Sequence, residues 1–258
     1  MEYSSKKISE LSQLYYENGW VVLKKFFSKN NIEQLKITCF KYLKKNYKKY
    51  KGKDINYSGN LQKFEDINSF HKAADISKVK KIAKDNKFNI LIKNFLNNED
   101  PKYMDSEIFV KPALKGLPSP AHQDNYYWAI KGGNAITVWV ALNKADKKNG
   151  GIYYLNKSHK IGVVEHVPSY AKGSSQTIKN LKNLRKFKKI YPKLNRGDVI
   201  IHNSEVIHGS GPNKSKFPRT GLTFQFKSKK STTDKKQLNK YLRLLEMQLK
   251  TRSEIAQF

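Results

Sequence analysis

Short apolar segments separated by glycine and proline fill the second half of the chain. They are EIFVKPAL (107–114), HQDNYYWAI (122–130), NAITVWVAL (134–142), GIYYL (151–155), VIIH (199–202) and GLTFQF (221–226). Short runs rich in β-branched and aromatic residues, bounded by turn residues, are typical of antiparallel strands. This spacing predicts a barrel or jelly roll whose paired sheets bury alternate side chains.

Helical periodicity marks the first part of the chain. Ile8, Leu11 and Leu14 recur at helical spacing before Asn18-Gly19, and the strand-like WVVL (20–23) follows. Ser28 is a suitable N-cap for a second helix. Residues 54–105 read as loop and short helices, with one helix expected from Ser77 through Leu96.

The chain end also has a helical pattern. Between residues 234 and 250 one stripe carries Leu238, Leu242, Leu245 and Leu249, which we expect to pack on the barrel. We therefore predict a single α+β domain over residues 1–258. It comprises a helical N-terminal part (1–105), a jelly-roll core (106–227) and a C-terminal helix (234–250).

Charge and cysteine content restrict the setting of the protein. The formal net charge is +30, but the excess is mostly lysine spread from Lys6 to Lys250, as a compositional drift of a whole proteome would produce. Charge alone therefore indicates no partner. Cys39 is the only cysteine and no segment has the ~20 apolar residues of a membrane span, so we expect a cytoplasmic protein. The sequence does not decide between a monomer and a homodimer.

His122 and Asp124 form a pair with metal-binding spacing. In an extended segment, residues i and i+2 point to the same face, so an imidazole and a carboxylate can reach one metal ion. Gln123 must then point away. A pair of this kind is common by chance and indicates little alone.

His208, in IIHNSEVIHGSGPN (200–213), supplies a third candidate ligand. Two histidines and one carboxylate on one face of an octahedron leave three positions open, which is the arrangement of non-haem Fe(II) oxygenases. A tetrahedral zinc site with the same ligands remains open at this point.

Arg219 lies eleven residues after His208, at the start of the GLTFQF strand. A hairpin would return its guanidinium toward the metal, and arginine is well shaped to grip a carboxylate through two parallel hydrogen bonds. A dicarboxylate co-substrate needs such a group. In a chain this basic, a surface position is the alternative.

The chain resembles the phytanoyl-CoA dioxygenase family of Fe(II)- and 2-oxoglutarate-dependent oxygenases. The resemblance is carried, in matching order, by YYENGWVVLKKFFSKNNIEQLK, IFVKPA, AHQD, WVALNKADKKNGGIYYLNKSHK and RGDVIIHNSEVIHGSGPNKSKFPRTGLTFQF. It implies a double-stranded β-helix (jelly-roll, cupin-like) core. The family's usual Pro-Gly-Ser-His turn is replaced here by Asn156-Lys157-Ser158-His159, which puts the shape of that turn in doubt.

The resemblance also implies residue roles. His122, Asp124 and His208 would bind Fe(II), with 2-oxoglutarate and O2 as co-substrates. Arg219 would hold the distal carboxylate of 2-oxoglutarate, with Ser210 and Trp139 beside it. The reaction implied is hydroxylation of an unactivated C–H bond. A carboxylate at position 124 argues against the halogenating relatives, which carry a small residue there.

Other residues compete for roles or extend the site. The other four histidines are His71, His159, His166 and His202, and His202 is the main rival to His208. Lys111, Asn125 and Tyr127 are candidate substrate contacts, although core or incidental positions are equally compatible with the sequence. The excursion from 159 to 193 is long enough for a lid.

The function expected is a dioxygenase acting on a small polar or anionic metabolite or an acyl or saccharide conjugate. One alternative is a nucleic-acid-directed oxygenase, motivated by the charge of +30. Repair oxygenases of this fold generally carry a second arginine six residues after the first, where this chain has Gln225. Nucleic acid is therefore an unlikely partner. The other alternative is a jelly-roll binding module without catalysis.

Overall fold

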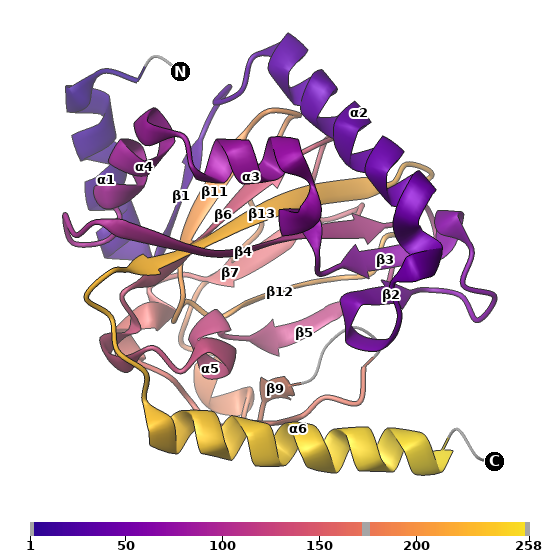
Figure 1. Ribbon diagram of the computed structural model, residues 1–258. Helices are drawn as coiled ribbons and strands as arrows, with labels where there is room; N and C mark the ends of the chain where they lie inside the picture. The colour runs from indigo at the N-terminus through magenta and orange to yellow at the C-terminus, as the bar shows by residue number, and fades with distance from the viewer. Residues whose placement is uncertain (1–2, 172–175, 256–258) are drawn as a thin grey trace.

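Two antiparallel sheets form the centre of the protein (Figure 1). The computed structural model describes residues 3–171 and 176–255. The larger sheet has the strand order β1-β11-β6-β13-β4-β3-β2 and the smaller one β10-β7-β12-β5. Strands from distant parts of the chain alternate in both sheets, which is the predicted double-stranded β-helix in an α+β fold.

The strands of the larger sheet are β1 (Trp20–Leu23), β2 (Ile55–Tyr57), β3 (Ile67–Phe70), β4 (Pro101–Lys111), β6 (Ala135–Ala141), β11 (Val199–Asn203) and β13 (Arg219–Ser228). The smaller sheet contains β5 (Ser119–His122), β7 (Ile152–Leu155), β10 (Lys189–Ile190) and β12 (His208–Ser210), and β8 (His166–Pro168) pairs with β9 (Gln176–Ile178) outside both sheets. The helices are α1 (Ser5–Asn18), α2 (Lys29–Asn46), α3 (Ser77–Ala83), α4 (Asn86–Lys93), α5 (Asp124–Trp128) and α6 (Lys235–Ile255).

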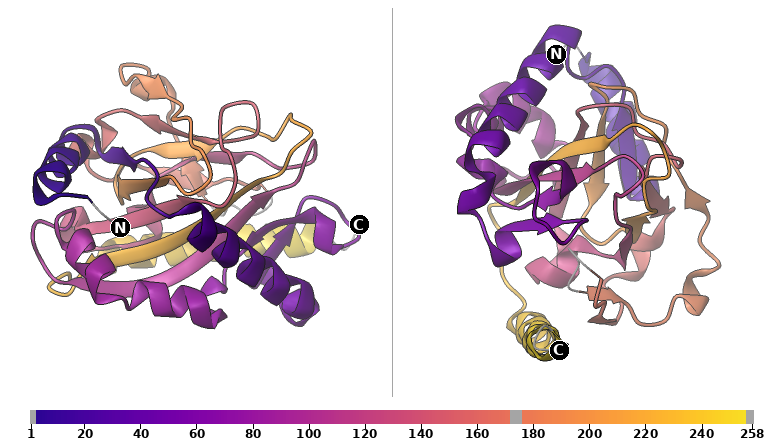
Figure 2. Two further views of the ribbon diagram at one scale, coloured as in Figure 1. Left: turned by 90° about the horizontal axis from the view of Figure 1, so that it is seen from above. Right: turned by 90° about the vertical axis from the view of Figure 1, so that its right-hand side faces the viewer.

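Strand alternation divides the larger sheet into an outer face that joins the main hydrophobic core and an inner face that carries a second apolar cluster and the polar residues of a cavity. On β6, for example, Ile136 and Val138 join the main hydrophobic core, whereas Thr137 and Trp139 line an inner cavity. The outer face packs against α1 to α4, which contribute buried residues such as Leu35 to the same core. Figures 1 and 2 show these helices gathered on one side of the sheet. The candidate site residues of the larger sheet therefore lie on its inner face.

The helix expected from Ser77 through Leu96 is two helices in the structure. Asp85 lies between α3 and α4, and its carboxylate accepts a hydrogen bond from the backbone N–H of Phe88 at 2.9 Å. A side-chain cap of this kind starts a new helix with a changed direction. The first 105 residues contribute the expected strand β1 to the larger sheet. They also contribute β2 and β3, which were not expected.

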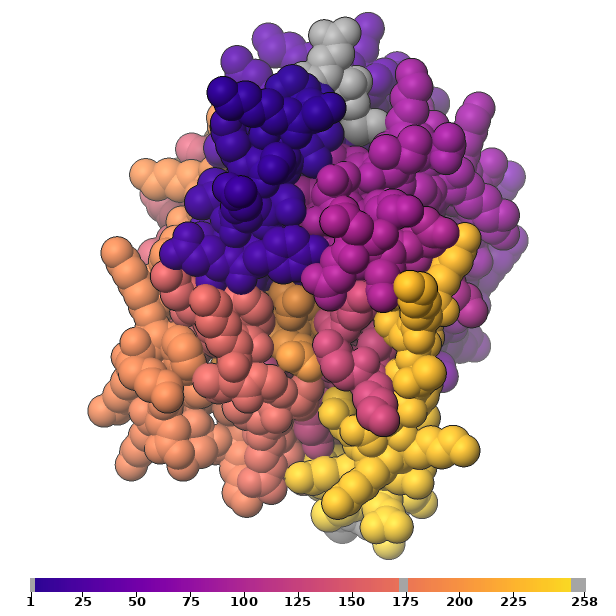
Figure 3. Space-filling model, turned by 90° about the vertical axis from the view of Figure 1, so that its left-hand side faces the viewer, coloured from indigo at the N-terminus to yellow at the C-terminus, as the bar shows by residue number. Residues whose placement is uncertain are grey.

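The N-terminal and C-terminal helices lie at opposite ends of the face in Figure 3. Helix α6 contacts α5 and β8, which lie beside the two sheets. The expected leucine stripe is wrong in part, because Leu242 and Leu249 are exposed while Gln248 is buried. At 3.6 residues per turn, positions 238, 241, 245 and 248 share the inward side instead.

The excursion from 159 to 193 lies partly against the core. Strand β9 contacts β5, and β8 contacts α6, whereas residues 172–175 of the expected lid lie outside the described residues. Over the part of the chain that the structure describes, none of the helices has the length and apolar character to cross a membrane.

Candidate metal centre and co-substrate pocket

Neighbouring strands of the smaller sheet bring the two candidate histidine ligands together. His122 at the end of β5 and His208 at the start of β12 are direct register partners. Asp124 begins α5, and the extended backbone of Gln123 (φ −124°, ψ 132°) keeps its carboxylate on the His122 side. The Nε2 atoms of His122 and His208 lie 3.7 and 3.5 Å from Asp124 Oδ1. Ligand atoms of all three residues lie within 4.8 Å of one another.

Backbone carbonyls set the tautomer of both histidines. His122 Nδ1 lies 2.8 Å from the oxygen of Pro120, and His208 Nδ1 lies 3.0 Å from that of Val206. Because a carbonyl oxygen only accepts, each Nδ1–H donates, and each Nε2 keeps its lone pair for a metal. Burial lowers the pKa of both His122 and His208 to about 4, so both rings are neutral at pH 7.

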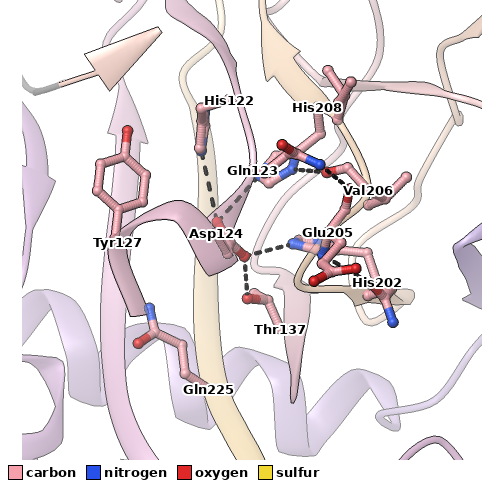
Figure 4. Close-up of polar contacts among 12 residues, drawn as sticks. His122, Gln123, Asp124, Tyr127, Thr137, His202, Glu205, Val206, His208 and Gln225 are labelled. Atoms are coloured by element: carbon pink, nitrogen blue, oxygen red, sulfur yellow. Dashed lines mark hydrogen bonds and ion pairs between the residues drawn. The ribbon is translucent and has the colours of Figure 1, made fainter. Parts of the chain in front are cut away.

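The second oxygen of Asp124 is held by two donors from the larger sheet (Figure 4). Thr137 Oγ1 donates to Oδ2 at 2.6 Å, and His202 Nε2 lies 3.1 Å from the same atom. His202 Nδ1 lies 2.9 Å from the Tyr154 hydroxyl. Burial raises the pKa of Asp124, but His208 and His202 outweigh it and the pKa lies far below its usual range.

His202, the main rival for a ligand role, therefore orients the carboxylate. The other histidines lie in separate contacts: His71 with Glu107, His159 with the backbone of Tyr16, and His166 with the backbone N–H of Gln123. The side chain of Gln123 points away from the candidate ligands, as its alternation predicted, and donates to the carbonyls of Gly162 and Glu205.

A cavity of about 90 Å³ opens beside these ligands, between the two sheets. Its lining includes the three candidate ligands together with Ser119, Thr137, Trp139, Ile152, His202, Ser210, Arg219, Glu107, Phe109, Thr223 and Gln225. The structure thus brings Ser210, Trp139 and Arg219 into the same space as the candidate metal ligands.

Arg219 is a buried cation, only 2% exposed. Its Nε and Nη2 both donate to the carbonyl of Gly150, at 3.1 and 2.9 Å, and its guanidinium carbon lies 5.5 Å from the centroid of the Trp139 ring. Burial lowers the pKa of Arg219 to about 9. Within the described residues no carboxylate lies at ion-pair distance from it.

Gly221 makes room for Trp139 next to this arginine. A Cβ atom at Gly221 would lie 2.0 Å from Cζ2 of the indole, closer than any side chain tolerates. The glycine between Arg219 and Thr223 on the inner face of β13 therefore lets the indole lie flat against the sheet.

The three candidate substrate residues occupy different environments. Lys111 is buried, and its ammonium donates to the carbonyls of Leu117 and Gly211 at 2.6 and 2.7 Å. Asn125 is buried too, and its amide bonds both backbone groups of Ile130. Neither Lys111 nor Asn125 is among the described residues that line the cavity. The ring of Tyr127 lies edge-on to His122, with centroids 5.8 Å apart.

Sequence reasoning missed Glu107 and Thr137 as cavity residues. Both alternate with apolar neighbours on strands that it had located, so the period of two in EIFVKPAL and NAITVWVAL carried the signal. It also missed the helical turn α5, since residues 122–130 were expected to be extended throughout.

Comparisons with known proteins agree with this geometry. The profile of the phytanoyl-CoA dioxygenase (PhyH) family matches residues 15–221. Peroxisomal phytanoyl-CoA dioxygenase of Bos taurus is 25% identical over 234 residues, which cover 84% of this chain and 67% of the bovine protein. A probable alpha-ketoglutarate-dependent hypophosphite dioxygenase of Stutzerimonas stutzeri is 23% identical and covers 83% of this chain and 76% of that protein.

Solved structures share the fold. The non-heme alpha-ketoglutarate-dependent carbocyclase SnoK from nogalamycin biosynthesis superposes with a TM-score of 0.71 at 16% identity, covering 90% of this chain and 87% of SnoK. EctD from S. alaskensis, with 2-oxoglutarate and 5-hydroxyectoine, gives 0.69 at 20% identity and covers 88% of this chain and 79% of EctD. Because the family profile matches most of the chain, this protein belongs to the phytanoyl-CoA dioxygenase family of Fe(II)- and 2-oxoglutarate-dependent oxygenases.

Proposed function

We propose that this protein hydroxylates an unactivated C–H bond of a small polar or anionic metabolite, or of an acyl or saccharide conjugate. In this proposal His122, Asp124 and His208 hold Fe(II), and Arg219 binds the distal carboxylate of 2-oxoglutarate. The observation that carries it is the buried Arg219, without a carboxylate partner among the described residues, in the same cavity as the three-ligand set.

The donor set fits iron. Two neutral imidazole nitrogens and one carboxylate oxygen, which lie within 4.8 Å of one another, would hold Fe(II) and leave it positions open for a co-substrate. When bound, the iron supplies the oxidising chemistry that converts C–H to C–OH with 2-oxoglutarate and O2. The chain supplies the geometry: backbone carbonyls fix both imidazoles, and Thr137 and His202 hold the free oxygen of Asp124.

The co-substrate end of the cavity suits a carboxylate. Arginine has five N–H donors, and the two that bond within the described chain share one acceptor, the carbonyl of Gly150. The others remain for a ligand carboxylate, which Ser210 can also contact from β12. The indole of Trp139, whose ring centroid lies 5.5 Å from the guanidinium carbon, would help to keep water from this end.

Family membership selects no substrate. The similar proteins include a probable hypophosphite dioxygenase, a carbocyclase and an epimerase, which differ in the chemistry of the molecule they act on. Substrate identity must therefore come from the cavity of this chain. The single cysteine, Cys39, is buried with its pKa raised to about 12, and we infer a reducing compartment such as the cytoplasm.

The test is succinate formation on aerobic incubation with Fe(II), 2-oxoglutarate and a panel of small polar and anionic metabolites. We expect Arg219→Gln to raise the KM for 2-oxoglutarate by about 10- to 100-fold, because a charge-assisted pair contributes roughly 1.5–3 kcal/mol. Arg196→Gln is the matched control, since Arg196 is exposed and pairs with Glu33 on the surface.

Two results would contradict the proposal. One is the absence of succinate and of any metal-centred absorption band with the wild-type protein. The other is an unchanged KM in Arg219→Gln, which would show that 2-oxoglutarate does not meet the guanidinium.

A further inference from the structure

A second charged group lines the cavity away from Arg219. Among the described lining residues the carboxylates are Asp124 and Glu107, and Asp124 already faces the two histidines. Glu107 Oε1 accepts from His71 Nδ1 at 2.5 Å, and Oε2 accepts from the Gln225 amide at 2.8 Å. Gln225 also lines the cavity. Glu107 is therefore held by hydrogen bonds from two residues, and it is not one of the candidate metal ligands.

The acceptor capacity of Glu107 is only half used. A carboxylate accepts about four hydrogen bonds, and His71 and Gln225 supply two. Its side chain is 22% exposed and lines the cavity. The remaining lone pairs can be met only by a donor, which is water in the free protein and a ligand group in a complex.

His71 fixes the carboxylate from behind. Its Nε2 contacts Ser69 Oγ at 2.9 Å and Asn56 Nδ2 at 3.1 Å, and its ring packs edge-on against Phe109. Burial lowers the pKa of His71, but the Glu107 carboxylate outweighs it and the net pKa is raised. A carboxylate anchored in this way presents its free lone pairs in a constant direction, as a recognition group requires.

The sheet register separates Glu107 from the co-substrate end. Arg219 pairs with Lys111, whereas Thr223, four residues further along β13, pairs with Glu107, a distance of roughly 13 Å along the strands. Gln225 pairs with Thr137, which holds Asp124. Glu107 thus lies level with Thr223 and Trp139, and Gln225, which donates to Glu107, lies level with Thr137 beside the candidate metal ligands.

We propose that Glu107, positioned by Gln225 and His71, is a specificity-determining residue that accepts a hydrogen bond from a hydroxyl or amine of the primary substrate. It disfavours substrates that present a carboxylate or phosphate at this end, because two anions would face each other in a partly desolvated cavity. The inference rests on the proposed function and narrows its substrate class to molecules with a donor group near the reacting carbon.

Three probes with one carbon skeleton test the inference. The protein is loaded with Fe(II) and 2-oxoglutarate without oxygen and titrated calorimetrically with cyclohexanol, cyclohexylamine and cyclohexanecarboxylate. We expect the alcohol and the amine to bind at least about 10-fold more tightly than the carboxylate, since a hydrogen bond to a charged group is worth roughly 1.5 kcal/mol or more. Glu107→Gln should remove most of the preference for the amine, and Glu107→Lys should reverse the order.

The ratio of affinities is a readout that a merely structural role would not move. Glu165→Gln serves as the control, because Glu165 is exposed and pairs with Lys179 on the surface. Equal or tighter binding of the carboxylate by the wild type, no binding of alcohol and amine up to their solubility limits, or an unchanged ratio in Glu107→Gln would each overturn the inference. Wild-type succinate formation tests the proposed function separately, so the two failures are distinguishable.

Discussion

Arg219 and Lys111 face each other as register partners on β13 and β4, and they differ in where their donors point. Both are 2% exposed, and neither has a carboxylate at ion-pair distance among the described residues. Lys111 divides its ammonium between the carbonyls of Leu117 and Gly211, which closes a turn. Arg219 places both bonded N–H groups on one carbonyl and lines the cavity.

Burial and charge alone therefore do not identify a ligand-binding cation. The pKa of Lys111 is lowered by burial and by the positive charge of Arg219, because two like charges lie close together in the interior. A dicarboxylate bound at Arg219 would reduce the repulsion between these two cations. The same distinction, between a group that faces the cavity and a group that supports it, applies to the histidines.

The largest expected effect separates the candidate ligands from the histidine that supports them. We expect Asp124→Ala and His208→Ala to abolish iron binding with the fold intact, because each removes one of three donors. His202→Ala should retain iron with affinity reduced by about 10- to 100-fold, since it loses only a hydrogen bond to Asp124. Equilibrium dialysis with Fe(II) measures both effects.

Circular dichroism of each variant checks that the fold is kept. Iron retained by Asp124→Ala or His208→Ala would contradict the assigned ligand set. Complete loss in His202→Ala would move His202 from a supporting role to a ligand role, and the contrast with His208 would disappear.

Lys111 should matter for stability and not for co-substrate binding. Lys111→Met keeps the aliphatic stem but leaves the carbonyls of Leu117 and Gly211 without their donor, and we expect the free energy of unfolding to fall by about 1–3 kcal/mol. The KM for 2-oxoglutarate should stay at the wild-type value, unlike that of Arg219→Gln. Urea denaturation and succinate assays measure the two quantities, and a raised KM in Lys111→Met would break the comparison.

Local pattern was sufficient for the parts of the site in which spacing alone determines geometry. The extended Gln123 places His122 and Asp124 on one side, and the outer face of β6 is apolar at alternate positions, as the sequence predicted. The match to the family profile and the sheet topology confirm the predicted family and the jelly roll. The sequence could predict them because the order of several motifs along the chain carries more information than any single motif. The assigned roles of Ser210, Trp139 and Arg219 stay predictions.

The remainder depends on contacts between distant segments. Helix α5 forms within an aromatic run with strand propensity, because the Asn125 side chain bonds the backbone of Ile130 and so closes the turn. The role of Glu107 depends on its register with β13 and on His71, 36 residues earlier. Strand β12 has three residues and no alternating pattern of its own, so only its neighbours define it.

The last expected effect concerns protons on the two candidate ligand histidines of the metal-free protein. Their pKa values are about 4 in the folded chain and about 6.5 in an unfolded one, so the unfolded state binds more protons between these values. The free energy of unfolding should therefore fall as pH falls from about 6.5 to 4, by at most ~1.4 kcal/mol per pH unit for each histidine, and change little from this source below. His208→Ala should show a shallower slope in metal-free urea titrations, because it lacks one of these groups and because His122 loses the neighbour that helps to lower its pKa. Equal slopes in both proteins would mean that burial does not hold the two rings neutral. The pKa values of His122 and His208 would then be those of ordinary surface histidines.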